Sequence, residues 1–137
     1  MIFAIKTEVL DPDAKTFVFA RQKTMYEGKR VKVGDIIYVF ASENEGGSGL
    51  IARGTVTTSS PTPKIPGIER QTPRVSITVK RAARSTRRLG RKELKPFSDW
   101  DAQTPETELN FKFYRQATNK IVGISENAAA FLDGHFR

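Results

Sequence analysis

Residues 33–57 read VGDIIYVFASENEGGSGLIARGTVT, and this stretch carries the clearest strand pattern of the chain. Its first apolar run, residues 36–41, is hydrophobic at every position, which is typical of a strand buried on both faces in the middle of a sheet. A polar, glycine-rich loop follows at residues 42–49, and a second strand over residues 50–57 completes the hairpin. The sequence therefore predicts an antiparallel pair whose first strand is central.

Segments on both sides of this hairpin predict further strands. Residues 2–9 form an apolar opening strand, residues 75–80 alternate between apolar and polar side chains, and residues 119–124 form a late strand. Residues 14–26 fit either a helix or a strand, because apolar residues at helical spacing coexist with a strand-like Thr-Phe-Val-Phe run.

Short helices complete the pattern. We expect one at residues 91–95, one that begins at residue 104 and becomes extended before residue 114, and a last one at residues 126–132 with Ser125 as its cap. Residues 58–74 are rich in proline and predict an irregular surface loop. The expected fold is α+β: a small, mixed, partly open β-barrel flanked by short helices, with residues 1–137 as a single domain.

Composition excludes several classes of function. The 137 residues contain no cysteine and one histidine, His135, so a zinc–sulfur site, a thiolate nucleophile and a Ser-His-Asp triad are excluded or nearly so. No apolar run approaches the ~20 residues of a membrane-spanning helix. We expect a soluble, cytoplasmic protein with no cofactor, no metal and no membrane partner.

Positive charge is concentrated in one segment. The chain has a formal net charge of +8, and residues 80–95, KRAARSTRRLGRKELK, hold eight basic residues against one acidic residue. A solvated surface normally mixes the two signs of charge. The segment therefore favours a polyanionic partner, DNA or RNA.

Three stretches carry a family resemblance. Residues 3–8 read FAIKTE, residues 33–42 read VGDIIYVFAS, and residues 113–125 read FYRQATNKIVGIS. An opening strand of the form aromatic-apolar-x-Lys-x-Glu, a Gly-Asp turn and a strand ending in an aromatic residue, a small residue and serine are features of EVE domains. The chain resembles these EVE-type domains of the PUA-like superfamily, which also includes ASCH and YTH domains.

The resemblance implies a non-catalytic module that holds one nucleobase, often a modified one, in a pocket of the barrel. Such a pocket needs an aromatic face for stacking and polar groups that meet the edge of the base. Trp100 is the first candidate for stacking, although it could instead cover one end of the core, and Lys6 could instead mark the solvated end of its strand. The candidate pocket residues are Lys6, Ser42, Glu43, Asn44, Trp100, Phe113, Tyr114 and Asn119.

Cations beside the pocket would hold the flanking phosphates, and arginine suits this role because its guanidinium donates in pairs. The candidate phosphate ligands are Arg81, Arg84, Arg87, Arg88, Arg91, Lys92, Arg115 and Lys120. Two other functions stay open: a small enzyme acting on a nucleotide or on RNA through lysine or carboxylate chemistry, and a protein-interaction domain that uses the proline-rich loop.

Overall fold

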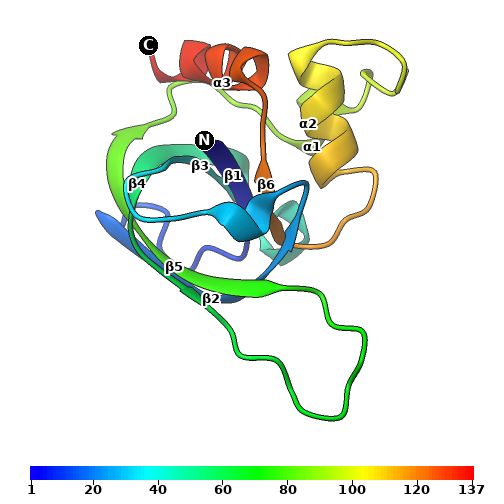
Figure 1. The fold of residues 1–137 in the computed structure, drawn as a ribbon. Coiled ribbons are helices and arrows are strands. Elements are labelled where there is room, and N and C mark those ends of the chain that lie inside the picture. The colour runs from blue at the N-terminus through cyan, green and yellow to red at the C-terminus, as the bar shows by residue number, and fades with distance from the viewer.

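Six strands form a closed barrel in the computed structural model, which describes residues 1–137 (Figure 1). Around the barrel the strand order is β1-β3-β4-β5-β2-β6. The strands are β1 Ile2–Thr7, β2 Thr16–Met25, β3 Ile36–Ala41, β4 Gly49–Pro61, β5 Arg74–Arg84 and β6 Lys120–Gly123. The α-helices are α1 Arg91–Leu94, α2 Pro105–Phe113 and α3 Glu126–Asp133, and the 3-10 turns are η1 Gly28–Arg30, η2 Glu43–Glu45 and η3 Gly134–Phe136.

The expected small α+β barrel is confirmed, but the barrel is closed and not partly open, and the hairpin of residues 33–57 forms two of its neighbouring strands. β3 and β4 pair antiparallel, with Ile36 opposite Thr55. β1 lies between β3 and β6, parallel to the first and antiparallel to the second. The barrel is closed because β2 pairs with β6, with Thr24 opposite Ile121.

The ambiguous segment 14–26 forms strand β2. Phe17 and Phe19 face the core while Val18 is exposed, so the alternation of a strand outweighs the helical spacing. A bulge interrupts the pairing of β2 with β5 between Phe19 and Gln22, and Arg21 within it has φ 52°. The bulge bends the strand so that it reaches both β5 and β6.

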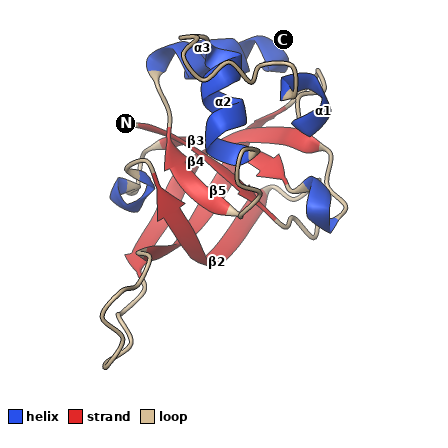
Figure 2. Cartoon of the chain, turned by 90° about the vertical axis from the view of Figure 1, so that its right-hand side faces the viewer, coloured by secondary structure: helices blue, strands red, loops and turns tan.

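The helices follow their capping signals. The Thr104 side chain accepts a hydrogen bond from the backbone N–H of Thr107, and α2 stays helical to Phe113, where an extended end had been expected. The Ser125 side chain caps α3 by accepting from the backbone N–H of Ala128. The helices gather on one side of the barrel, whereas the proline-rich loop protrudes from the other side (Figure 2).

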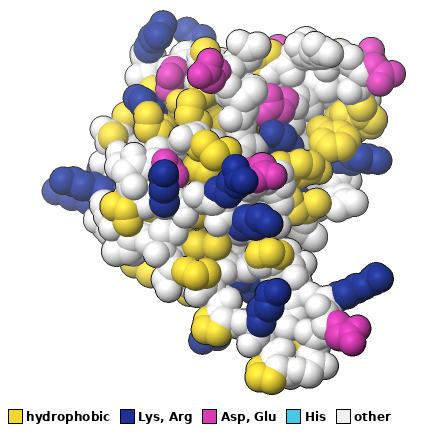
Figure 3. All heavy atoms as spheres, in the orientation of Figure 1, with side chains coloured by type: hydrophobic (Ala, Val, Ile, Leu, Met, Phe, Trp, Pro, Cys, Tyr) yellow, Lys and Arg dark blue, Asp and Glu magenta, His cyan; other side chains and the backbone are white.

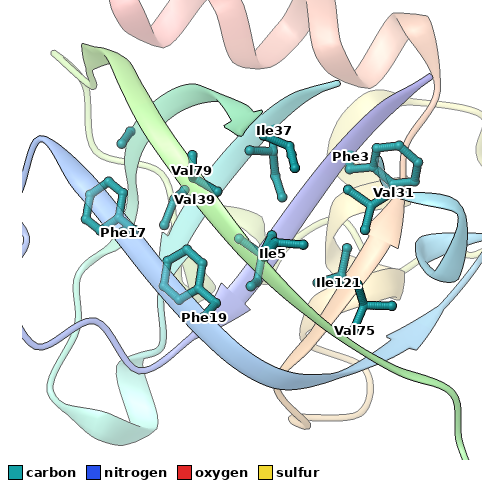
Figure 4. Packing of buried hydrophobic residues seen from close by; sticks show 13 residues of the cluster. Phe3, Ile5, Phe17, Phe19, Val31, Ile37, Val39, Val75, Val79 and Ile121 are labelled. Carbon is teal, nitrogen blue, oxygen red and sulfur yellow. The ribbon is translucent and has the colours of Figure 1, made fainter. Parts of the chain in front are cut away.

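Both faces of β3 are buried, as its composition predicted, because two cores lie on either side of it. Ile37 and Val39 point into the barrel, where they pack with residues of the other strands (Figure 4). Tyr38 and Phe40 point outward and pack beneath the helices. The longest helix, α2, has nine residues, so none of the helices could span a membrane.

Candidate functional site

Two polar side chains at the ends of β1 and β3 are buried without a partner. Lys6 and Ser42 have exposed fractions of 0% and 1%, and neither the Lys6 Nζ nor the Ser42 Oγ has a hydrogen-bond partner. They lie close because β1 and β3 run parallel and the Ser42 N–H donates to the Thr7 carbonyl at 2.9 Å. Burying an unpartnered polar group is costly, so this pair stands out from the rest of the core.

Tyr114 connects this pair to the loop after β3. The Lys6 Nζ lies 5.0 Å from the centre of the Tyr114 ring. The Tyr114 hydroxyl donates to the Glu43 carboxylate, at 3.0 Å from each oxygen. Burial, together with the negative charge of Glu43, raises the pKa of Tyr114, so the hydroxyl keeps its proton and its role as a donor.

Arg91 brings one cation of the basic segment to the same cluster. Its backbone N–H donates to the Glu43 carboxylate at 2.7 Å, and its guanidinium donates to the Asn44 side chain at 2.7 Å. The guanidinium carbon lies 5.8 Å from the centre of the Tyr114 ring. We call Lys6, Ser42, Glu43, Tyr114 and Arg91 the polar cluster.

Burial lowers the pKa of two lysines, Lys6 of the cluster and the neighbouring Lys120. Burial lowers the pKa of Lys6, against the opposing effect of Glu43. Lys120, opposite Lys6 in the β1–β6 pairing, is buried as well, and burial together with the charge of Lys6 lowers its pKa to about 8. The Lys120 ammonium donates to the carbonyls of Gln116 and Thr118, so it fixes the loop before β6.

An open cavity of about 400 Å³ is lined by Thr7 and Asn44, the chain neighbours of Lys6 and Glu43, and by none of the five cluster residues themselves. The loop after β3 forms one wall through Asn44 and Glu45, and the loop before β6 forms another through Thr118 and Asn119. The Asn119 amide donates to the Glu45 carboxylate at 3.0 Å and joins the two loops. The remaining lining residues are Arg21, Gln22, Lys23, Arg74 and Ala117. We call this space the site cavity.

The structure thus brings together most of the residues expected in a base pocket. Lys6, Ser42, Glu43 and Tyr114 belong to the polar cluster, and Asn44 and Asn119 line the site cavity. Lys6, which could have marked a solvated strand end, is instead completely buried.

Two expected pocket residues lie elsewhere. Phe113 is completely buried and packs against Phe40 with ring centres 5.1 Å apart, so it belongs to the core beneath the helices and has no free face. Trp100 lies between α1 and α2, is 41% exposed, and packs edge-on against Phe111 at 5.4 Å. It lines a separate cavity of about 410 Å³ that neither Arg87 nor Arg88 reaches.

The expected phosphate ligands have different surroundings. Arg84 pairs with the Asp13 carboxylate at 3.1 Å, and Arg81 donates to the carbonyls of Asp13 and Ala14, so both hold the loop before β2. Arg87 and Arg88 line another cavity of about 410 Å³ with Arg84. The other members of the set are exposed Lys92, Arg115 stacked 4.7 Å from the Phe111 ring centre, and buried Lys120.

Sequence reasoning missed Arg21, Lys23 and Arg74, which bring positive charge to the site cavity. They are isolated basic residues on two strands that are distant in sequence, so no local run of charge marks them. The pairing of β2 with β5, in which Lys23 lies opposite Arg74, places them together. Arg21 lies in the bulge of β2 and has a positive φ, which the sequence does not indicate.

Comparison with known sequences finds no match for this chain, whereas comparison with solved structures finds several similar folds. No family model matches the sequence, and no curated protein matches it. Among solved structures, the DUF55 domain of human thymocyte nuclear protein 1 has a TM-score of 0.61 and 13% identity, covering 96% of this chain and 95% of that chain. A Pseudomonas putida protein has a TM-score of 0.65 and 14% identity over 100% of both chains.

A third solved structure contains a ligand. Human THYN1 protein in complex with DNA containing 5-methylcytosine has a TM-score of 0.64 and 15% identity, covering 98% of this chain and 97% of that chain. Identities this low establish a shared fold. The chain therefore shares the fold of these proteins, in agreement with the small barrel with flanking helices that its sequence predicted.

Proposed function

We propose that this protein is a non-catalytic nucleic-acid-binding module that holds one nucleobase at the polar cluster. The observation that carries the proposal is the burial of Lys6 and Ser42 without hydrogen-bond partners, next in the chain to residues that line the site cavity. A ligand that supplies an acceptor to the Lys6 ammonium would satisfy a buried donor, and this gain is available only in the complex.

A nucleobase fits this requirement better than a small ion alone. Bases present carbonyl and ring-nitrogen acceptors on their edges, and a base turned out of its stack exposes them. The Asn44 and Asn119 amides on the cavity wall provide further donors and acceptors for that edge. The shared fold with a protein solved on DNA containing 5-methylcytosine supports a base, modified or unmodified, as the ligand.

Phosphates next to the base would be held by cations around the pocket. Arg91 belongs to the cluster itself, and Arg87 and Arg88 precede it on the exposed basic segment. We assign the backbone grip to these three arginines rather than to Arg81 and Arg84, because the latter two are occupied by Asp13 and Ala14. Arg115, which directly follows Tyr114 in the chain, is a further cation that could hold a phosphate.

The test is a titration of labelled oligonucleotides that differ only in one central base, including cytosine and 5-methylcytosine, at two salt concentrations. Lys6→Met and Ser42→Ala should each reduce the preference for the best base by about 10-fold, because a hydrogen bond to a base edge is lost. Ser98→Ala, an exposed serine outside every cavity described above, is the matched control.

A second pair of variants tests the phosphate grip. Arg87→Gln with Arg88→Gln should weaken binding of all oligonucleotides alike and lower the salt slope by about 1.5, while the base preference stays the same. Binding that does not change with salt would refute the grip. A wild-type protein with equal affinity for every central base would refute the base pocket.

A further inference from the structure

A larger cavity, which we call the loop cavity, lies between the proline-rich loop and the barrel. Its volume is about 650 Å³, and four basic side chains line it with no carboxylate among the lining residues: Lys23, Lys29, Lys64 and Arg74. Glu69, the one acidic residue of the loop, does not line it. Figure 3 shows Lys and Arg side chains both on the loop at the bottom of the view and on the barrel surface above it. The positive charge of these side chains favours a negatively charged ligand.

The loop that forms this cavity is tied down from within. The Gln71 side chain accepts from the Ile65 N–H at 2.9 Å and donates to the carbonyls of Ile65 and Ile68. At its base, the Thr62 N–H donates to the Arg74 carbonyl at 2.8 Å. These bonds, together with the fixed φ of its prolines, lower the entropy cost of holding the loop against a ligand.

The loop cavity borders the site cavity, because the two share lining residues. Lys23 and Arg74 line both of them, one side chain from β2 and one from β5. The Arg74 guanidinium donates to the Arg21 carbonyl at 2.9 Å, which holds it at the boundary between the two spaces. A chain of phosphates that leaves the site cavity in this direction would meet cations without interruption.

We propose that the loop cavity binds the sugar–phosphate backbone of the same nucleic-acid strand, beyond the base held at the polar cluster. This inference rests on the proposed function. Lys29 and Lys64 contact phosphates two or more nucleotides from the base, and Pro63 and Ile65 pack against the apolar faces of the sugars. The loop thus forms a second cationic surface, separate in sequence from residues 80–95.

Oligonucleotide length separates this inference from the proposed function. Binding of a labelled trinucleotide and of a 12-nucleotide single strand with the same central base is measured by fluorescence anisotropy at several salt concentrations. The double variant Lys29→Gln with Lys64→Gln should bind the longer strand about 10-fold more weakly at low salt, with a salt slope lower by about 1.5. Its affinity for the trinucleotide should equal that of the wild type.

A matched control removes the same charge elsewhere. Lys15→Gln with Lys32→Gln changes two exposed lysines that line neither cavity, and it should alter binding of the longer strand less than about 2-fold. Equal losses in the two double variants would overturn the inference while leaving the proposed function standing. A wild-type protein that binds neither oligonucleotide would refute both.

Discussion

Lys6→Met is the substitution that separates stability from function most sharply. Methionine has nearly the volume and flexibility of lysine, so it fills the same buried space beside Tyr114 without the ammonium group. In the free protein the ammonium is buried and has no hydrogen-bond partner. Its removal should therefore stabilise the fold, although it removes a side chain that we assign to ligand binding.

The size of the gain follows from the cost of burying an unsatisfied polar group. That cost is about 1–3 kcal/mol in proteins, and the attraction of Lys6 to Glu43 and to the Tyr114 ring offsets part of it. We expect a net stabilisation of about 1 kcal/mol, which corresponds to a rise in Tm of roughly 3–5 °C for a domain of this size.

Urea denaturation gives the free energy of unfolding, and the oligonucleotide titration gives the loss of base preference on the same samples. The wild-type m-value should be preserved, which shows that the variant keeps the same folded state. A variant destabilised by about 2 kcal/mol would refute the reasoning, because Lys6 would then have to be satisfied in the free protein. Full base preference in a stabilised variant would remove Lys6 from the binding site.

Three further outcomes test other parts of the structure. Trp100→Ala should leave base preference unchanged, because its cavity is separate from the polar cluster, and it should cost about 1 kcal/mol of stability through lost packing on Phe111, as urea denaturation can show. Between about pH 8 and about pH 9.5 the free energy of unfolding should rise with pH by up to about 1.4 kcal/mol per unit. The reason is that folded Lys120, with its pKa of about 8, has lost a proton that the unfolded chain still binds, so Lys120→Met should flatten this rise. Gly90→Ala should fold normally and lose base preference, because the new methyl group would lie 2.5 Å from the flexible end of Glu43 and displace that carboxylate from the cluster.

The fold could be predicted from sequence where local pattern and burial agree. Ile36–Ala41 is apolar throughout because two cores cover it, and that pattern is visible without a structure. The segment of β2 fits a helix or a strand in sequence, because Val18, which is exposed in the structure, contributes to the helical spacing of its apolar residues. The sequence does not predict the helical end of α2, because Phe111 and Phe113 have the composition of a strand, whereas Phe113 packs as part of a helix into the core beneath the helices.

The site was predictable to the extent that sequence neighbours remain neighbours in space. Ser42, Glu43 and Asn44 leave a central strand together, and the structure keeps them at one place. Trp100 is a single aromatic residue on a loop, and nothing local indicates which end of the barrel that loop covers. Arg21 and Arg74 meet only through the pairing of β2 with β5, so only the topology reveals the charge at the site cavity.

Arg91 couples the two kinds of contact that the proposed function requires. It belongs to the basic segment, yet its hydrogen bonds go to Glu43 and Asn44, the residues expected to meet a base. A phosphate that attracts its guanidinium competes with the bond to Asn44 and frees that amide for the edge of the base. The backbone N–H of Arg91 still holds Glu43, and Glu43 still holds Tyr114, so the pocket keeps its shape while one of its amides is released. Binding of the backbone and reading of the base are therefore expected to reinforce each other through this one side chain.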